Sequence, residues 1–351
     1  MITCGADATI TSIVPRQARF RDRTSPAWRG SALADDRLSI VRTTYDSAPA
    51  SLDPSGPLHE LRLAAGRALR AKVAGPEARA RTQEIWGTPG SRWFTPTDPI
   101  WRVHNDAAMF AGGITALLVQ MLHPAAMAGV GDFSGYKSDP WGRLQRTADY
   151  IAVTTFGTIE AAEQVSARVA RIHDRVSGTD ELGRPYRGND PDLLLWVHDA
   201  EIDAFLRAYQ AYSPTPLTPA EADTYVEQTA IPARLLGIAD PPLTVAQLRS
   251  QLRGFRADLA ITNSAREASR FVVLHPPVGL AARPAYGMLV AGGVALVPGF
   301  ARRMLGLPLG PRAARWVARP FGHGAVAGVR WALGGLDKAN RLAPAARGQG
   351  L

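Results

Sequence analysis

The sequence predicts an all-α fold, and three observations support that class. Alanine, leucine and arginine, which are good helix formers, are abundant along the chain. The alternating Val, Ile and Thr runs that typify β-strands are almost missing from it. Hydrophobic residues make up 46% and charged residues 20% of the 351 residues, a composition typical of globular proteins. We therefore expect a single helical bundle.

The first segment, residues 1–56, mixes Ser, Thr, Asp, Arg and Pro without helical periodicity, so we expect it to be mobile. Its start lacks the continuous apolar run of a signal peptide. Cys4 is the single cysteine, which excludes a disulfide within the chain and any CxxC zinc motif. These features favour a reducing, cytoplasmic location.

Helical order is expected to begin at Pro57, where leucines and alanines start to recur at helical spacing. Three later helices are expected to begin at an aspartate followed by proline, because the carboxylate can cap free N–H groups and proline has none to leave unpaired. Two more starts have the spacing of a capping box, and Gly178 and Gly237 have the position of C-terminal caps. The five predicted starts are Asp98-Pro99, Asp139-Pro140, Asp190-Pro191, Thr218 to Glu221 and Thr244 to Gln247.

A helix is predicted from Thr158 to Ser177, where apolar residues at helical spacing mark a face that turns toward the core. His173 lies beside that face, one turn before the predicted end. We therefore expect its imidazole to point inward or to border a cavity. The residues of the face are Ile159, Ala162, Val165, Val169, Ile172 and Val176.

The net charge of +9 comes from arginines spread along the chain rather than gathered with aromatic residues, so we do not expect nucleic-acid binding. The stretch from Ala285 to Phe300 is apolar apart from its glycines, but it is shorter than the roughly 20 residues that a membrane span needs. We expect it to form a buried helix. The alternative is a peripheral membrane contact through this stretch and Arg302-Arg303.

Several chemistries are excluded because their motifs do not occur. The sequence has no HExxH or HxH zinc pair, no GxSxG elbow, no P-loop and no repeated ExxH of a di-iron bundle. It also lacks the CxxCH that attaches c-type haem. What remains is single histidines on helices, a pattern that suits haem b, since one imidazole is enough as axial ligand.

His173 has the best context for an iron ligand, because Arg171 and Arg175 flank it and could meet haem propionates. The alternative for His173 is a core histidine bonded to a backbone carbonyl. His198, on another predicted helix, is a further candidate for the haem pocket. The alternative for that residue is a structural hydrogen bond to Asp199.

Arg143 and Thr147 stand four residues apart and therefore on one helical face, which Thr154 continues. A buried arginine needs an anionic partner, and a haem propionate or a bound oxygen species would serve. The alternative is a surface arginine beside a threonine that is bonded to its own helix.

Ten short motifs in order resemble the catalytic domain of the MpaB-type and rubber oxygenases, the family that includes latex-clearing proteins. The resemblance covers roughly residues 57–310, and LVPGFARRMLGLP (296–308) is similar to the C-terminal part of the family. The motifs are RWF (92–94), WRVHND (101–106), AGG (111–113), QMLHP (120–124), GV (129–130), RLQRTADY (143–150), TTFG (154–157), RIHDRVSG (171–178), Tyr186 and DPDLLLWVH (190–198).

The resemblance implies a globin-like helical core that holds non-covalent haem b (iron protoporphyrin IX), with residues 311–351 as a C-terminal helical extension and tail. The axial histidine of the family falls on His173, and the arginine and threonine of its RxxxT pattern fall on Arg143 and Thr147. Latex-clearing proteins have a lysine in this pattern that can cap the distal side of the iron, where this chain has Arg146. Because an arginine does not readily lose its proton, we expect a distal side that is open or occupied by water.

The resemblance thus leads us to expect a haem b-dependent oxygenase, in which Arg143 and Thr147 orient O₂ bound at ferrous haem and stabilise its partly anionic oxygen. The expected substrate is an apolar, alkene-containing, isoprenoid-like small molecule. The acidic residue that rubber enzymes place above the haem has no match, since Met127 lies near that point, so polyisoprene itself is not implied. The alternatives are a non-catalytic haem- or lipophile-binding protein and a helical interaction scaffold without a cofactor.

Overall fold

The structure is a computed structural model, and it describes residues 56–135, 137–307 and 310–342. The regular structure in these residues is helical apart from one short antiparallel hairpin, in which Ser177 pairs with Arg187 and Thr179 with Pro185. The all-α prediction is confirmed. The segment expected to be mobile, residues 1–56, lies outside the described residues except for Gly56, as do residues 343–351 of the expected tail.

The elements follow one another with short connections. The first half of the chain forms α2 (Pro57–Ala74), α3 (Ala78–Gly87), α4 (Pro99–His104), α5 (Met109–Gln120), α6 (Pro124–Phe133), α7 (Pro140–Phe156) and α8 (Ile159–His173). The hairpin of β1 (Ser177–Thr179) and β2 (Pro185–Arg187) comes next. The second half forms α9 (Pro191–Tyr212), α10 (Pro219–Leu235), α11 (Val245–Gly254), η1 (Phe255–Ala257), α12 (Asn263–Leu274), η2 (Leu280–Ala282), α13 (Arg283–Leu296), α14 (Gly299–Met304), α15 (Pro311–Ala313), η3 (Ala314–Ala318) and α16 (Arg319–Leu342).

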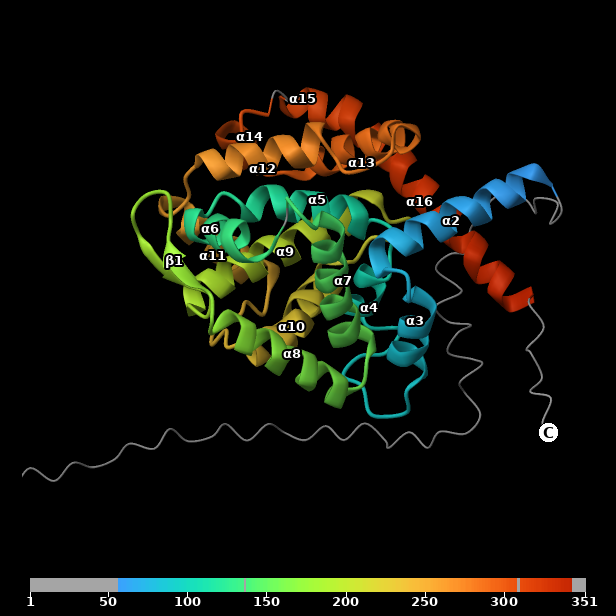
Figure 1. Ribbon diagram of the computed structural model, residues 1–351, viewed down its shortest axis with the longest axis horizontal. Helices are drawn as coiled ribbons and strands as arrows, with labels where there is room; N and C mark the ends of the chain where they lie inside the picture. Colours follow the sequence, from blue (N-terminus) through green and yellow to red (C-terminus); the bar gives the residue numbers. More distant parts are fainter. Residues whose placement is uncertain (1–55, 136, 308–309, 343–351) are drawn as a thin grey trace, which may run out of the picture.

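Helix α9 lies at the centre of the fold and packs along α5. Figure 1 shows α12, α13 and α14 as a layer on one side of it, with α7, α8 and α10 on the other. Each side has its own hydrophobic cluster: Trp196 of α9 belongs to the one that contains Val294 of α13, and Phe205 to the one that contains Tyr225 of α10. The core is therefore built on both faces of one buried helix.

The three aspartate–proline helix starts are all observed, but only two of the aspartates act as caps. Asp139 accepts a hydrogen bond from the Gly142 N–H at 2.9 Å, and Asp190 caps α9 in the same way. Asp98 does not cap α4, so that part of the prediction was wrong. Its carboxylate instead accepts from the Thr95 N–H at 2.6 Å and from the Gln228 amide at 2.7 Å, which ties α4 to α10.

The capping-box predictions hold fully at one helix and partly at the other. Thr218 and Glu221 form both reciprocal hydrogen bonds at the start of α10. Thr244 accepts from the Gln247 N–H at 3.2 Å, but the Gln247 side chain accepts from Leu243 instead of Thr244. Helix α11 therefore has a capped start, but it lacks the second hydrogen bond that would complete a capping box.

Helix α8 ends at His173, earlier than the predicted Ser177. The Val176 carbonyl accepts from the Gly188 N–H at 2.7 Å, so the chain enters the hairpin instead of adding a helical turn. Gly178 is consequently not a helix cap; it lies in β1, where a Cβ would come within 2.9 Å of the Tyr186 hydroxyl.

One residue of the predicted core face of α8 is not buried: Ile172, next to the end of the helix, is 54% exposed. The second predicted C-terminal cap is confirmed. Gly237 follows the end of α10 with a φ of +96°, the left-handed conformation that a C-terminal glycine supplies.

The apolar stretch predicted as a buried helix corresponds to α13, and the C-terminal half of α13 is buried. Its glycines allow two close approaches: a Cβ on Gly292 would lie 2.6 Å from the Gly322 Cα of α16, and one on Gly293 would lie 2.8 Å from Ile114 of α5. Among the described residues, no single helix has both the length and the apolar character of a membrane span, although α5 and α6 meet that test jointly as a pair bent by 110°.

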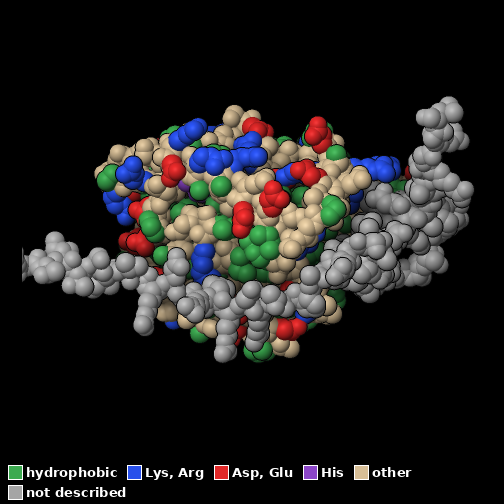
Figure 2. Space-filling view, turned by 90° about the horizontal axis from the view of Figure 1, so that it is seen from below, with side chains coloured by type: hydrophobic (Ala, Val, Ile, Leu, Met, Phe, Trp, Pro, Cys, Tyr) green, Lys and Arg blue, Asp and Glu red, His purple; other side chains and the backbone are tan. Residues whose placement is uncertain are grey.

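The face seen from below in Figure 1 mixes both signs of charge. Figure 2 shows acidic and basic side chains interspersed over it.

Candidate functional site

Helices α7 and α8 form a pair joined by a tight turn at Gly157 and Thr158. A Cβ on Gly157 would lie 2.6 Å from the Val153 carbonyl oxygen, so the turn needs a glycine. Thr158 then caps α8 by accepting from the Ala161 N–H at 3.2 Å. Figure 1 shows the two helices diverging from this turn. The start of α7 and the end of α8 therefore lie at the open end of the pair.

The polar residues of α7 lie along one face. Arg143, Thr147, Tyr150 and Thr154 are spaced by four, three and four residues, which places them on one side of a helix. Thr154 is buried and donates to the Tyr150 carbonyl at 2.8 Å. This face runs from the open end of the pair toward the turn.

On α8, Ser166 and His173 are seven residues apart and hence share a face. Burial raises the pKa of Tyr150 to about 12, an effect that the nearby Ser166 hydroxyl partly offsets. The polar faces of α7 and α8 therefore meet at Tyr150 and Ser166.

Four buried polar atoms on α7, α8 and α9 are unpaired. The Tyr150 hydroxyl, the Ser166 hydroxyl, His173 Nδ1 and His198 Nε2 have no hydrogen-bond partner among the described residues. Buried polar groups are nearly always paired in folded proteins, because each unpaired one costs about 1–3 kcal/mol. Each of these atoms is therefore a candidate contact for a bound ligand.

Helix α9 brings His198 and Glu201 to one side, since three residues separate them. Burial lowers the pKa of His198 to about 4 and raises the pKa of Glu201 to about 7, the latter offset in part by Gln120. The charge of Glu201 in turn raises the pKa values of Tyr150 and Tyr225, although burial is the larger cause in both. Glu201 is therefore electrostatically linked to the α7–α8 pair.

The position of α9 is fixed by two hydrogen bonds to the end of α5. Trp196 Nε1 donates to the Gln120 carbonyl at 3.1 Å, and Gln120 Nε2 donates to the Val197 carbonyl at 3.0 Å. Since these bonds lie immediately before His198, they set the rotation of α9 that decides which way its polar residues turn.

His104 is a structural residue beside the same cluster. Its Nδ1 lies 2.8 Å from the Thr155 hydroxyl and its Nε2 lies 3.3 Å from the Tyr225 hydroxyl. Burial lowers the pKa of His104 to about 3, so this ring is neutral at physiological pH. Both nitrogens are engaged, which leaves neither for a ligand.

Comparison with protein families places this arrangement in a known class. Residues 101–331 match the family described as "ER-bound oxygenase mpaB/B'/Rubber oxygenase, catalytic domain". The chain belongs to this oxygenase family. No curated protein and no solved structure matches it.

The matched region of the oxygenase domain contains α7, α8 and α9 entirely and extends to Trp331 in α16. The family resemblance inferred from the ten motifs is thus confirmed. Helix α16 packs against α13 and α2, so the residues after 310 continue the helical body as far as they are described.

The residues that the sequence singled out in this oxygenase domain fall into two groups. Arg143 is half-buried on α7 and His173 is half-buried as the last residue of α8. Burial lowers the pKa of His173, which favours the neutral imidazole. His198 is unpaired rather than bonded to Asp199, since neither Asp199 oxygen has a hydrogen-bond partner among the described residues.

The second group is exposed. Thr147 is exposed and donates to the Arg143 carbonyl at 3.2 Å, as the surface alternative predicted. Arg146 is also exposed and forms an ion pair with Asp139 at 3.3 Å. Arg171 and Arg175 are exposed next to His173. Arg146 lies in the first half of α7, and Arg171 and Arg175 lie beside the end of α8.

Sequence reasoning missed three residues of this cluster, although spacing could have found them. Tyr150 continues the face of Arg143 and Thr147, Ser166 precedes His173 by two helical turns, and Glu201 follows His198 by three residues. Their burial depends on which helices pack together, and the sequence does not give that.

Proposed function

We propose that this protein is a haem b-dependent oxygenase that holds its cofactor at the open end of the α7–α8 pair. The observation that carries the proposal is the buried, unpaired ring nitrogen of His173. A histidine nitrogen without a hydrogen-bond partner is free to serve as a metal ligand, and a depressed pKa keeps the ring neutral for that role. Membership in an oxygenase family supports the class of reaction.

The residues around His173 fit a porphyrin better than a bare metal ion. Among the described residues, no group of three or more His, Cys, Asp and Glu side chains is arranged to hold a metal. A porphyrin supplies four ligands by itself and needs a single histidine from the protein. Arg171 and Arg175 are exposed and flank His173 in the sequence, and under this proposal they would pair with the propionates of the cofactor.

When bound, haem supplies the redox-active iron that activates O₂. The chain supplies binding, orientation and protons. Arg143 provides hydrogen-bond donors on one face of α7, and the Tyr150 hydroxyl adds a deeper donor on that face, whereas the exposed Thr147 hydroxyl already donates to the Arg143 carbonyl. Because its pKa lies at about 7, Glu201 can hold or release a proton near neutral pH.

The proposed substrate is an apolar, alkene-containing molecule of isoprenoid type. Hydrophobic side chains such as Val153, Phe156 and Val165 pack in the core beside the polar faces of the two helices. In the cleavage of one C=C bond by O₂, each of the two carbons receives one oxygen atom and becomes a carbonyl. The products would then be two aldehydes or ketones.

The haem proposal is tested by the absorption spectrum of the full chain after incubation with hemin. We expect a Soret band in the wild type and in His275→Ala, whose histidine is exposed at the end of α12, and loss of the band in His173→Ala. A wild type without a Soret band, or a His173→Ala variant with an unchanged band, would contradict the proposal.

Turnover is tested by oxygen consumption with squalene, using its saturated counterpart squalane as control. We expect consumption with squalene alone, together with carbonyl products. A Soret band without any oxygen consumption, by contrast, would favour the non-catalytic haem carrier.

A further inference from the structure

A second site lies along the C-terminal half of α9, away from His198 and Glu201. A cavity of about 800 Å³, partly open to solvent, is lined by α9, α10, α11, the turn from α13 to α14 and the start of α16. Helix α9 contributes Leu206, Arg207 and Gln210 to its wall. At about 100° per residue, Arg207 and Gln210 point about 120–180° away from His198 and Glu201. The cavity is therefore separate from the proposed oxygenase site.

The wall of this cavity has an excess of positive charge. Its carboxylates are already engaged: Asp203 accepts from Arg207 Nε at 2.5 Å, and Asp223 accepts from the Val245 N–H at 2.8 Å. The other three cations of the wall, Arg249, Arg302 and Arg319, form no ion pair with any described residue.

Two of these arginines repel each other. Burial lowers the pKa of Arg302, and the positive charges of Arg303 and Arg319 lower it further. The Arg302 guanidinium is half-buried, and its single hydrogen bond is a long one of 3.4 Å to the Ala295 carbonyl. A bound anion would relieve both the repulsion and the loss of hydration.

The segment that carries Arg302 and Arg319 contributes no carboxylate to the wall. No Asp or Glu occurs between Glu267 and Asp337, a stretch that contains α13 to α15 and most of α16. Arg302 and Arg319 both come from this stretch. Arg330, from the same stretch, points to Asp106 instead. The excess of positive charge is therefore a property of this whole layer of the fold.

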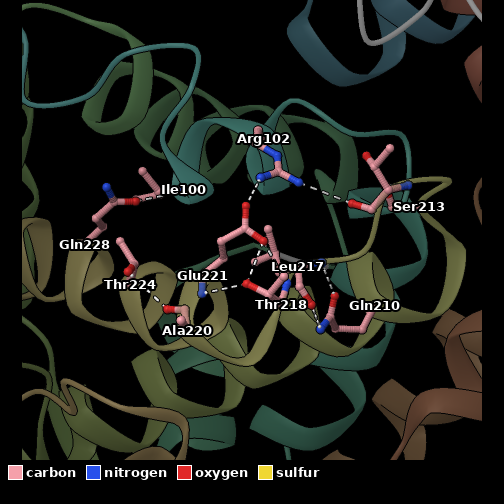
Figure 3. Close-up of polar contacts among 11 residues, drawn as sticks. Ile100, Arg102, Gln210, Ser213, Leu217, Thr218, Ala220, Glu221, Thr224 and Gln228 are labelled. Atoms are coloured by element: carbon pink, nitrogen blue, oxygen red, sulfur yellow. Dashed lines mark hydrogen bonds and ion pairs between the residues drawn. The ribbon is translucent and has the colours of Figure 1, made fainter.

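Figure 3 shows the polar contacts of the connection from α9 to α10, which borders the cavity at Gln210 and Leu217. The Gln210 amide accepts from the Leu217 N–H at 2.7 Å and donates to the Leu217 carbonyl at 2.8 Å. Glu221 receives an ion pair from Arg102 at 2.5 Å while it completes the capping box with Thr218. These bonds fix the connection from α9 to α10, so little further ordering is needed when a ligand binds.

The remaining wall is apolar, with Leu206, Leu296 and Val297 among its residues. We propose that this cavity binds an amphiphilic anion, with a carboxylate or phosphate head on Arg302 and Arg319 and a short apolar body against these side chains. Guanidinium groups match the geometry of both head groups. The volume lies within the range of small-molecule sites, about 300–1,000 Å³.

The test is calorimetric titration of the full chain without haem and without turnover, so it is independent of the proposed function. The probes are octanoate, octyl phosphate, inorganic phosphate and octanol. We expect octanoate or octyl phosphate to bind at least about tenfold more tightly than inorganic phosphate or octanol, because head and body both contribute. Which of the two binds more tightly identifies the head group.

The variants Arg302→Gln and Arg319→Gln should each weaken that binding about tenfold or more, whereas Arg270→Gln, an exposed arginine of α12 outside the wall, should leave it unchanged. Arg319 is exposed, so its variant keeps the test valid if the Arg302 variant fails to fold. Equal binding of inorganic phosphate and octyl phosphate, no binding of any anion, or an equal loss in Arg270→Gln would each overturn the proposal.

Discussion

Arg330 of α16 donates from one nitrogen to both carboxylate oxygens of Asp106, at 2.8 and 3.1 Å, although 224 residues separate them. The Asp106 side chain is buried, and it also accepts from the Ala108 N–H at 2.7 Å just before α5. The pair therefore joins the C-terminal helix to the start of the matched oxygenase region.

Replacing Arg330 with methionine should leave the Asp106 charge buried without a cation. We expect the free energy of unfolding to fall by about 3–5 kcal/mol, which is typical of a broken buried pair. Urea denaturation followed by circular dichroism measures it. The control is Glu267→Gln, which removes an exposed ion pair with Lys137 and should cost less than about 1 kcal/mol. Equal losses in the two variants would contradict the prediction.

Gly292 and Gly287 lie in the same helix but meet different surroundings. A Cβ at 292 would lie 2.6 Å from the Gly322 Cα, whereas one at 287 has nothing within 4 Å. We expect Gly292→Ala to lower the free energy of unfolding by about 1–3 kcal/mol through overpacking. Gly287→Ala should raise it by about 0.5–1 kcal/mol, because alanine favours the helix. Thermal and urea unfolding of the two variants would measure these changes. A similar decrease in the free energy of unfolding for both variants would argue against the close packing of α13 on α16.

Most of the fold could be predicted from local signals. Aspartate–proline pairs and the Thr218 capping box marked helix starts because a cap is a property of a few neighbouring residues. Asp98 failed as a cap because its partner Gln228 is 130 residues away. The prediction of where α8 ends was wrong for a similar reason. The hairpin that follows the helix is closed by a hydrogen bond from Gly188, which is distant from the predicted end in the sequence.

The site was only partly predictable, for the same physical reason. Motif order led to His173 and Arg143, because both lie in segments with recognisable neighbours. Tyr150 and Glu201 emerged from packing, since each is defined by the burial that α7, α8 and α9 impose on it. The cavity along the C-terminal half of α9 draws on segments from 203 to 319, and no local pattern predicts such a convergence.

Glu201 should give the protein a distinct pH dependence. Its pKa is raised by burial from 4.5 to about 7. Burial favours the protonated carboxyl of Glu201 in the folded state. The free energy of unfolding is therefore highest below pH 4.5, and it falls as the pH rises to about 7. Relative to the wild type, Glu201→Gln should thus become more stable across this window by about 1.4 kcal/mol per pH unit.

Urea denaturation of both proteins between pH 4.5 and 8 measures this difference. The matched control is Glu163→Gln on the exposed face of α8, whose difference from the wild type should stay constant over the same range. A constant difference for Glu201→Gln as well would show that the Glu201 carboxyl is hydrated in solution.

Tyr150→Phe should separate function from stability. The Tyr150 hydroxyl is buried without a hydrogen-bond partner among the described residues, so its removal relieves an unpaired polar group. We expect the free energy of unfolding to stay constant or to rise by up to about 1 kcal/mol. If the hydroxyl serves the oxygenase site, oxygen consumption with squalene should fall about tenfold or more.

Tyr286→Phe is the matched control, because that hydroxyl donates to the Val272 carbonyl at 2.9 Å. The free energy of unfolding of Tyr286→Phe should fall by about 1 kcal/mol, and its oxygen consumption should stay at the wild-type level. If Tyr150→Phe instead lost stability and kept its turnover, the hydroxyl would be a structural group.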